Sequence, residues 1–180
     1  MNEGLIPHRY AKALYKVAVE RGEDRALYDL CGRLADAFAE EPTIQQTVAN
    51  PFVSDADKLK LLMTAAGATD KDHTYCDFLK LLADNRRIDS AGAVARDYRA
   101  IYRFQNNIYR VDVVSAAKLD PSEEERLKKL IENRLDGGKM EYTSSVDPSL
   151  IGGFTVNIDN RRLDASVKNQ LKQLRLALLN

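Results

Sequence analysis

Asp147-Pro-Ser-Leu-Ile-Gly-Gly-Phe-Thr-Val156 is the most informative segment of this sequence, and Leu163-Asp-Ala-Ser-Val167 follows it closely. Its proline, its glycine pair and its alternating apolar residues predict a turn that leads into a β-strand. Asp164 and Ser166 have side chains that cap helices, so a final amphipathic helix is expected from about Ser166 to the end of the chain. The stretch contains no pair of nucleophile and base and no cluster of metal ligands. It therefore predicts a local structure and not a reaction.

The first hundred residues have the pattern of short helices in succession. Apolar residues recur at helical spacing, and Gly22, Pro42, Asn50-Pro51 and Gly67 interrupt them. Six short helices with short links predict a compact helical bundle. The helices are expected at about residues 10–21, 27–38, 44–48, 55–66, 72–84 and 90–104.

The pattern changes after Asn106-Asn107, where β-branched residues become frequent and favour strands. Strands are expected at about residues 108–114, 140–144, 154–158 and 161–163, with helices at 121–134 and from 166 onward. Asp120-Pro121 has the sequence of a helix start, and Gly137-Gly138 is expected to end that helix. Strand, helix, strands and helix predict a small α+β domain. The sequence thus predicts two domains, a helical bundle over residues 1–105 and an α+β domain over residues 106–180.

The composition disfavours several classes of function. Of the 180 residues 44% are hydrophobic, and Lys+Arg and Asp+Glu each number 27. Because neither half of the chain has an excess of basic residues, nucleic acid is not expected as a partner. No run approaches the roughly 20 apolar residues of a membrane-spanning helix, so direct membrane insertion is not expected either. No signal peptide is recognisable, and Cys31 and Cys76 lie in apolar helical patterns, which together favour a reducing compartment.

No catalytic, cofactor-binding or metal-binding residue is predicted. His8 and His73 lie in separate helices and outside the spacings of zinc ligands. Gly137-Gly-Lys139 resembles part of a phosphate loop, but Met140 stands where Ser or Thr would bind magnesium, so the glycines are interpreted as a helix C-cap. Gly152-Gly153 lacks the spacing of a dinucleotide-binding motif, and a bulge or a tight strand entry is expected there.

Two predicted helices have more apolar surface than packing on one core requires. In the first helix the apolar residues cover an arc of about 240°, whereas a surface helix needs little more than about 100°. The fifth helix leaves only a narrow polar edge. Both helices are either central to the bundle or line a groove for the amphipathic helix of a partner, and the pattern fits both alternatives equally.

The final helix raises the same question. Val167, Leu171, Leu174 and Leu178 form a stripe that suits packing on its own domain or on another helix. Leu176 lies on the opposite side of this helix, where the same core cannot reach it. A fraying chain end and a docking edge for a partner are both compatible with this pattern.

Short motifs distributed over nearly the whole chain carry a family resemblance. They are Arg9-Tyr-Ala-Lys-Ala-Leu-Tyr15, Asn50-Pro51 with Lys58, Phe78-Leu-x-Leu-Leu82 with Asn85-Arg-Arg87, Val114-Ser-Ala116, Leu150-Ile-Gly-Gly-Phe154 and Asp164-Ala-Ser-Val167. In this order and spacing they resemble the delta subunit of F-type ATP synthases, which is called OSCP in mitochondria. The chain departs from the family pattern at Asn106-Asn107, where glycine is common, and at Arg161-Arg162, which adds positive charge to the last hairpin.

The resemblance implies a non-catalytic stator subunit of the peripheral stalk, which couples proton-driven rotation to ATP synthesis without a cofactor. The domain at 1–105 would hold the N-terminal helix of an alpha subunit of the catalytic head, in a groove between the first and fifth helices. The domain at 106–180 would hold the C-terminal part of b-type stalk subunits. By their position on the two helices, the candidates for partner binding are Tyr10, Ala13, Leu14, Val17, Phe78, Leu79 and Leu82.

Further expectations follow from the same resemblance. The protein would lie peripherally on the cytoplasmic face of a bacterial cell membrane, as part of the ATP synthase complex. An aspartate in place of Leu14 or Phe78 should abolish binding of the alpha-subunit helix while the fold survives. Two other classes of function stay open, namely a generic helical adaptor for a different partner helix and an enzyme with an unfamiliar carboxylate site.

Overall fold

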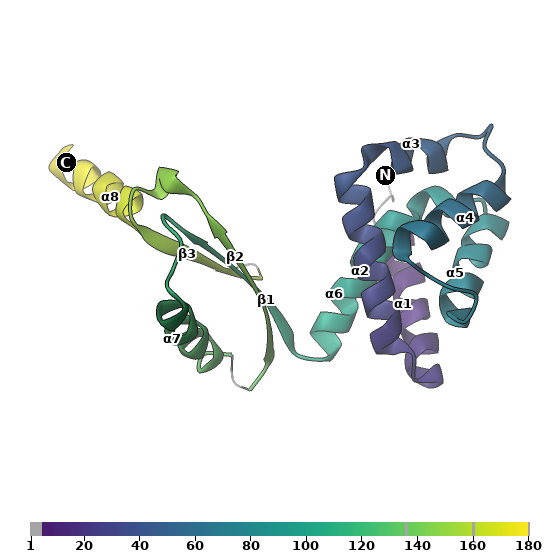
Figure 1. Ribbon diagram of the computed structural model, residues 1–180, viewed down its shortest axis with the longest axis horizontal. Helices are drawn as coiled ribbons and strands as arrows, with labels where there is room; N and C mark the ends of the chain where they lie inside the picture. Colours follow the sequence, from purple (N-terminus) through teal and green to yellow (C-terminus); the bar gives the residue numbers. More distant parts are fainter. Residues whose placement is uncertain (1–4, 136, 160, 180) are drawn as a thin grey trace. The chain divides into compact units, whose positions relative to one another are not determined.

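The chain forms two compact units that meet between Arg103 and Phe104. The structure is a computed structural model, and it describes residues 5–135, 137–159 and 161–179. The first unit consists of helices, and the second is built around a small sheet (Figure 1). The molecule is therefore helix-rich with a C-terminal α+β part, and the boundary lies close to the change of sequence pattern at Asn106-Asn107.

Helix-breaking and helix-capping residues divide the first unit into its elements. The elements are α1 (Leu5–Arg21), α2 (Asp24–Glu40), α3 (Pro42–Ala49), α4 (Asp55–Ala66), α5 (His73–Asp84), the short 3-10 helix η1 (Ile88–Ser90) and α6 (Ala91–Gln105). Gly22 and Gly67 follow α1 and α4 with φ of 68° and 60°, a backbone region that glycine enters without strain. The Ser54 hydroxyl accepts a hydrogen bond from the Asp57 amide at 3.2 Å and caps α4.

Large side chains from α2, α4, α5 and α6 fill the core of the helical unit. Those with almost no solvent exposure include Leu27, Leu34, Leu62, Tyr75, Leu79, Leu82 and Tyr98. The two tyrosine hydroxyls keep hydrogen bonds inside this core, because Tyr75 donates to the Leu62 carbonyl and Tyr98 to the Asp24 carbonyl, each at 3.1 Å. Cys31 is buried and free, and burial raises the pKa of its thiol to about 12. Cys31 is therefore a small core residue, as its apolar surroundings in the sequence predict, whereas Cys76 is only half-buried.

The second unit is a four-stranded sheet with two helices. Its elements are β1 (Ile108–Ser115), α7 (Pro121–Glu132), β2 (Lys139–Val146), the 3-10 helix η2 (Pro148–Leu150), β3 (Gly153–Ile158), β4 (Arg161–Ser166) and α8 (Val167–Leu179). The described strands have the order β2-β1-β3-β4, with β1 parallel to β2 and the other pairs antiparallel. The connection from β1 to β2 passes through α7, because parallel neighbours require a crossover.

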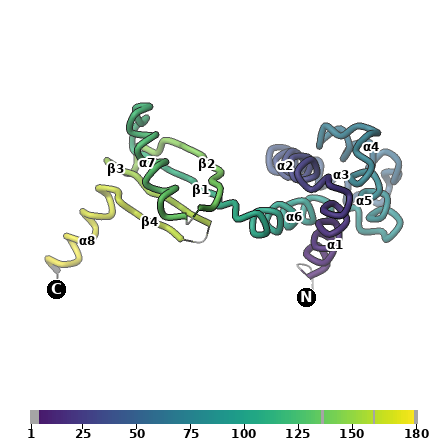
Figure 2. Tube along the Cα trace, turned by 90° about the horizontal axis from the view of Figure 1, so that it is seen from below, coloured from purple at the N-terminus to yellow at the C-terminus, as the bar shows by residue number. Residues whose placement is uncertain are grey.

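One face of the sheet forms the core of this unit with α7. Val111, Val113 and Val156 of the sheet pack with Ile131 and Leu135. The helix α7 lies along that face, and α8 projects beyond the strands from the end of β4 (Figure 1, Figure 2). The core is small, which makes the turns that set the strand register important for this unit.

Two aspartate–serine turns frame β3 and β4. The carboxylate of Asp147 accepts hydrogen bonds from the amide and the hydroxyl of Ser149, at 2.9 and 3.0 Å. Asp164 accepts the same pair of bonds from Ser166, and the Ser166 hydroxyl in turn accepts from the Asn169 amide at 3.2 Å and caps α8. These bonds hold the pKa of both carboxyl groups below their usual value. The predicted cap at Ser166 is confirmed.

Two backbone positions adopt left-handed conformations that the sequence anticipates. Gly153 opens β3 with φ of 73°, and a side chain there would collide with the carbonyl oxygen of Ala165 on the paired strand. The tight strand entry expected at the glycine pair is thus present. Asn107, which stands where glycine is common in the related family, has φ of 51°, a conformation that asparagine tolerates.

The predicted end of α7 is wrong. The helix stops at Glu132, and Asn133 after it keeps a helical φ of −61°, so Gly137 and Gly138 do not cap it. The chain instead turns inward to bury Leu135 in the sheet core, and the Gly138 amide donates to the Leu135 carbonyl at 2.8 Å. Gly137, with φ of 82°, belongs to the turn before β2.

Replacing Gly153 with alanine should destabilise the sheet far more than replacing Gly137. Both substitutions force alanine into a left-handed conformation, which costs about 1–2 kcal/mol. Only Gly153→Ala adds a collision with a paired strand, since the space around Gly137 is open. Amide hydrogen exchange of β1 and β3 in the full chain measures the difference. Equal loss of protection in the two variants would show that the close approach of β3 and β4 does not hold the sheet.

Candidate functional site

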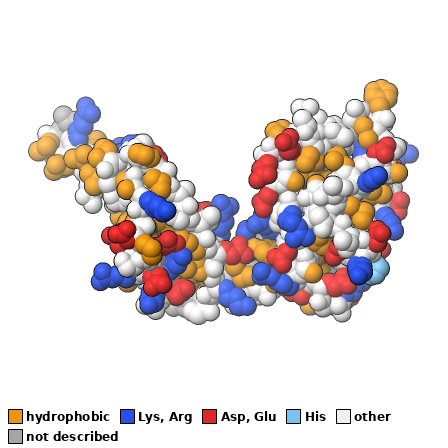
Figure 3. Space-filling model, viewed as in Figure 1, with side chains coloured by type: hydrophobic (Ala, Val, Ile, Leu, Met, Phe, Trp, Pro, Cys, Tyr) orange, Lys and Arg blue, Asp and Glu red, His pale blue; other side chains and the backbone are white. Residues whose placement is uncertain are grey.

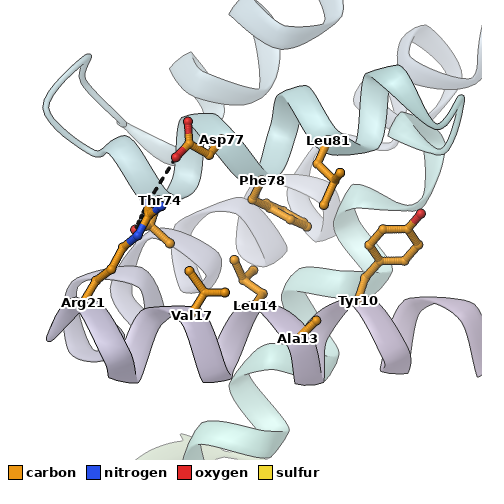
Figure 4. Close-up of a pocket in the computed structure, with 9 residues that line it drawn as sticks. All are labelled: Tyr10, Ala13, Leu14, Val17, Arg21, Thr74, Asp77, Phe78 and Leu81. Atoms are coloured by element: carbon orange, nitrogen blue, oxygen red, sulfur yellow. Dashed lines mark hydrogen bonds and ion pairs between the residues drawn. The ribbon is translucent and has the colours of Figure 1, made fainter.

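A hollow of about 180 Å³ lies between α1 and α5 of the helical unit (Figure 4). Its lining is apolar along most of its length and polar at one end. The lining residues are Tyr10, Ala13, Leu14, Val17, Arg21, Thr74, Asp77, Phe78 and Leu81, and we call this hollow the α1–α5 groove. The two helices run in opposite directions along it, so that Arg21 meets the start of α5 and Tyr10 lies toward Leu81 (Figure 4).

The groove exists because α1 presents two adjacent apolar faces. Ala11 and Ala18 are fully buried on the face toward the core. Tyr10, Leu14 and Val17 follow each other at spacings of four and three residues and form the neighbouring face. The arc of apolar residues is therefore wide because α1 faces both the core and the groove, whereas binding of a partner helix there stays a prediction.

The groove has a buried floor and exposed lips. On the floor, Leu14 and Phe78 are only 7% and 3% exposed. The lips are Ala13 and Val17 on α1 and Asp77 and Leu81 on α5, where Val17 is 38% and Leu81 50% exposed. Because large apolar side chains remain open to water on both sides, the groove offers unsatisfied apolar surface.

A polar network closes one end of the groove. The Arg21 guanidinium donates to the Thr74 hydroxyl at 3.0 Å and to the Asp77 carboxylate at 3.1 Å. The Thr74 hydroxyl in turn donates to the Glu23 carboxylate. An exposed ion pair of this kind contributes at most about 1 kcal/mol. Its main effect is to fix the end of α1 against the start of α5 and so to set the width of the groove.

The structure brings five of the seven predicted binding residues into the groove. Tyr10, Ala13, Leu14, Val17 and Phe78 line it. Leu79 and Leu82 have no exposure and lie in the core behind Phe78, so they do not line the groove. The sequence prediction missed Leu81 and the polar end. The wide apolar arc of α5 was the available signal for Leu81, whereas nothing in the sequence pairs Arg21 with Asp77, which is 56 residues away.

The shape and chemistry of the groove favour a peptide over a small molecule. Pockets for drug-sized ligands and cofactors have volumes of about 300–1,000 Å³, and this hollow is smaller. Its floor is apolar, and its charged groups at the closed end are already paired. It suits a few apolar side chains that project from an amphipathic helix laid along the lips.

A second hollow, on the sheet of the C-terminal unit, is polar, and its carboxylates already take part in bonds within the sheet. It is lined by Arg110, Asp112, Asn157, Asp159, Arg161 and Arg162. Asp112 pairs with Arg110 at 2.9 Å and accepts from the Thr143 hydroxyl at 2.8 Å. Asp159 accepts from the Arg110 amide at 3.1 Å and ties the β3–β4 turn to β1. These carboxylates tie β1 to β2 and to the turn between β3 and β4.

Within the described residues, other kinds of site are not evident. No group of three or more His, Cys, Asp or Glu residues in that part of the chain is arranged to hold a metal ion. None of the helices described there has both the length and the apolar character for crossing a membrane.

The final helix carries a second exposed apolar surface. Leu171, Leu174 and Leu178 lie on one side of α8, and each is more than half exposed. Hydrophobic side chains gather over α8 on the face shown in Figure 3. Val167, the first residue of the predicted stripe, is half-buried and lies close to Gly152, whereas the three leucines remain largely open to solvent, and we call these three leucines the α8 stripe. Leu176, on the other side of α8, is also exposed.

A comparison with known protein families covers nearly the whole chain. The model of the ATP synthase delta (OSCP) subunit family matches residues 6–178. The chain belongs to this family. Two relatives are similar over nearly their whole length and are both ATP synthase subunit delta. The protein from Parabacteroides distasonis is 36% identical over 99% of this chain and 98% of its own. That from Phocaeicola vulgatus is 34% identical over 96% and 92%.

A solved structure supports the fold of this delta-family chain. A chain in the cryo-EM structure of the Toxoplasma gondii mitochondrial ATP synthase hexamer matches with a TM-score of 0.74. The two chains are 22% identical, and the match covers 97% of each. The likeness at this identity concerns the fold alone.

Aspartate substitutions should lower the stability of the helical unit much more on the floor of the groove than on its lips. Phe78→Asp and Leu14→Asp place a charge in the core and should destabilise the helical unit by at least the roughly 3 kcal/mol typical of lost core packing. The expectation from sequence that the fold survives these two changes is therefore revised. Val17→Asp and Leu81→Asp change exposed sites and should cost less than about 1 kcal/mol. Denaturant unfolding measures all four, and wild-type stability of Phe78→Asp would refute this division.

Proposed function

We propose that this chain is a non-catalytic stator subunit of an F-type ATP synthase, and that it links the catalytic head to the peripheral stalk. Such a link lets proton-driven rotation be coupled to ATP synthesis, because it keeps the head from turning with the rotor. Membership of the delta (OSCP) family over residues 6–178 supports this role, as do the full-length relatives of the same name. The subunit acts through its binding surfaces.

The helical unit, with α1 to α6 as one bundle, binds the N-terminal helix of an alpha subunit in the α1–α5 groove. The exposed lips at Val17 and Leu81 above an apolar floor are the single observation that carries this assignment. Tyr10, Ala13, Leu14, Val17 and Phe78 would contact the helix, and Leu81 joins them. Leu79 and Leu82 would act indirectly, because they hold Phe78 in place from the core.

The C-terminal unit binds the C-terminal part of b-type stalk subunits through the α8 stripe. Leu171, Leu174 and Leu178 are exposed on one side of this helix, where a partner helix could cover them. A helix with so little contact to its own unit gains most of its stability from a partner. Arg161 and Arg162 are exposed on β4, ahead of the start of α8.

Two interfaces on one chain need only moderate affinity each. Once one unit is bound, the other is held near its partner, and its binding becomes effectively intramolecular. The relatives are bacterial proteins. We therefore place the chain on the cytoplasmic face of the cell membrane, as a peripheral part of the complex.

Binding of a peptide with the sequence of the alpha-subunit N-terminus tests the groove. Val17→Asp/Leu81→Asp should weaken binding by about 2 kcal/mol or more, roughly 30-fold in Kd, because each charge faces the apolar side of the peptide. Val19→Asp is the matched control, since Val19 is a half-exposed apolar residue of α1 outside the groove. Isothermal titration calorimetry with the full chain gives the three affinities.

Two results would count against this assignment. An equal effect of Val19→Asp and the lip variant would place the peptide elsewhere on the helical unit. If the folded wild-type chain ignores the alpha-subunit peptide but binds an unrelated amphipathic helix in the groove, it would be an adaptor for another partner.

The stalk contact is tested by charge on the α8 stripe. Leu171→Asp/Leu174→Asp should remove most binding to the C-terminal segment of a b-type subunit, because the stripe would no longer bury apolar surface. Leu176→Asp changes an equally exposed leucine on the other side of α8 and should bind within about twofold of wild type. Co-purification from membranes and direct titration both report the outcome, and unchanged binding of the double variant would exclude the α8 stripe as the contact.

A further inference from the structure

The two lips of the α1–α5 groove carry opposite charge. On α1, the row of residues outside the floor contains Arg9, Ala13, Lys16 and Glu20, which follow each other at spacings of three and four. Ala13 lines the groove, and Arg9 and Lys16 lie about 40° and 60° from Ala13 on the surface of α1, just outside the lining on the side away from the floor. Both are exposed. The α1 lip is therefore basic along its half nearer Tyr10.

The opposite lip is acidic. On α5, the outer row contains Asp77, Leu81 and Asp84 at the same helical spacing. Asp77 and Leu81 line the groove, and Asp84 continues the row at the end away from Arg21. Asp77 is paired with Arg21 at 3.1 Å, whereas Asp84 is exposed and lies outside the lining, about 60° from Leu81 on the surface of α5. His73 and Lys80, which are also exposed, lie about 20° and 40° from Asp84 on the surface of α5, on the side away from Leu81.

We infer that the α1–α5 groove selects an amphipathic helix with acidic side chains along the edge that faces α1 and basic side chains along the edge that faces α5. The inference rests on the proposed function of the groove and specifies the chemistry of its occupant. The apolar floor provides most of the affinity, and it is indifferent to the direction of the bound helix. The lips provide the discrimination, because complementary charges across an interface fix register and disfavour wrong arrangements.

The charges beside the groove determine in which direction a partner helix can lie along it. An amphipathic helix has one edge on each side of its apolar stripe. Turning the helix end for end over the same stripe exchanges the two edges between α1 and α5. A helix with one acidic and one basic edge therefore matches the lips in one direction only, and in the other direction it places Arg9 and Lys16 against lysines and Asp84 against glutamates. The lips thus orient the partner.

The test uses two designed helical peptides of equal length with the same leucine stripe. In the first peptide one edge is glutamate and the other lysine, and in the second the two edges are exchanged. Each carries a spin label at its N-terminus, and line broadening of backbone amides in the full-length chain shows whether that end lies near Tyr10 or near Arg21. We expect the label to lie at opposite ends of the groove for the two peptides. In Arg9→Glu/Lys16→Glu/Asp84→Lys, we expect each peptide to bind in the direction opposite to its direction in wild type.

Affinity gives a second readout. Lys16→Glu should raise the Kd of the bound peptide about fivefold at low ionic strength, since it turns one attractive surface contact into a repulsive one. In 1 M salt the difference should fall to less than about twofold, because the screening length is then only about 3 Å. Lys60→Glu is the matched control, because it makes the same change at an exposed lysine of α4, a helix that does not line the groove, and should have little effect at either salt concentration.

The outcomes distinguish this inference from the proposed function. Binding of both peptides with the label at the same end, or equal effects of Lys16→Glu and Lys60→Glu, would overturn the charge selection while the groove assignment stands. If neither these peptides nor the alpha-subunit peptide binds the folded chain, the groove itself is refuted, and this inference with it. Reversal of direction in the triple variant is the result that no purely apolar groove would give.

Discussion

The packing of α1 against α5 is the constraint on which the candidate site depends. Ala11 and Ala18 are fully buried and small, so α1 lies close to the rest of the helical unit on that face. The neighbouring face of α1 then cannot reach the same core, and Leu14 and Phe78 meet over a shallow hollow with Val17 and Leu81 on its lips. The Arg21–Asp77 pair joins α1 to α5 at one end, and the Thr74–Glu23 bond joins α5 to the connection between α1 and α2. The groove is thus a product of core packing, and any change that loosens the core also changes its width.

The C-terminal unit obeys a different constraint, which is the geometry of its turns. Its core contains few side chains, so the register of the strands depends on Gly153, on the Asp147–Ser149 turn and on the tie between Asp159 and the amide of Arg110. The cap at Ser166 starts α8 directly after β4 and points the helix beyond the sheet. The α8 stripe is exposed for this reason, because the sheet is already covered by α7 on the face that could have buried it. A helix of this kind is stable when a partner covers its leucines.

Much of this architecture could be predicted from the sequence, and the exceptions have physical reasons. Glycine, proline and capping residues mark the helix ends of the helical unit clearly, so the expected helices lie close to the observed ones. The tolerance of Asn107 for a left-handed backbone and the tight strand entry at Gly153 were also expected. The end of α7 was wrong, because burial of Leu135 outweighs the local preference for a cap at the glycine pair. On α1 and α5, the spacing of apolar residues indicated more apolar surface than one core needs. It did not indicate which of these residues belong to the core. Only the packing separates Leu79 and Leu82, which are buried, from Leu81, which is half exposed three residues after Phe78.

The two exposed apolar surfaces have one physical origin. Each unit has an amphipathic helix whose apolar residues exceed what its own core can bury, and exposed patches of this kind are typical of interaction sites. For the proposed stator role this arrangement is sufficient, because a stator needs contact at both ends and no chemistry between them. Apolar surface alone would hold a partner helix without defining the direction in which it lies. A helix held only in this way could slide along the groove under load. The opposite charges of Arg9 and Lys16 on one lip and Asp84 on the other supply the missing polarity. The floor determines the affinity for the partner helix and the lips determine its direction. The affinity can therefore change while the direction of the bound helix stays the same.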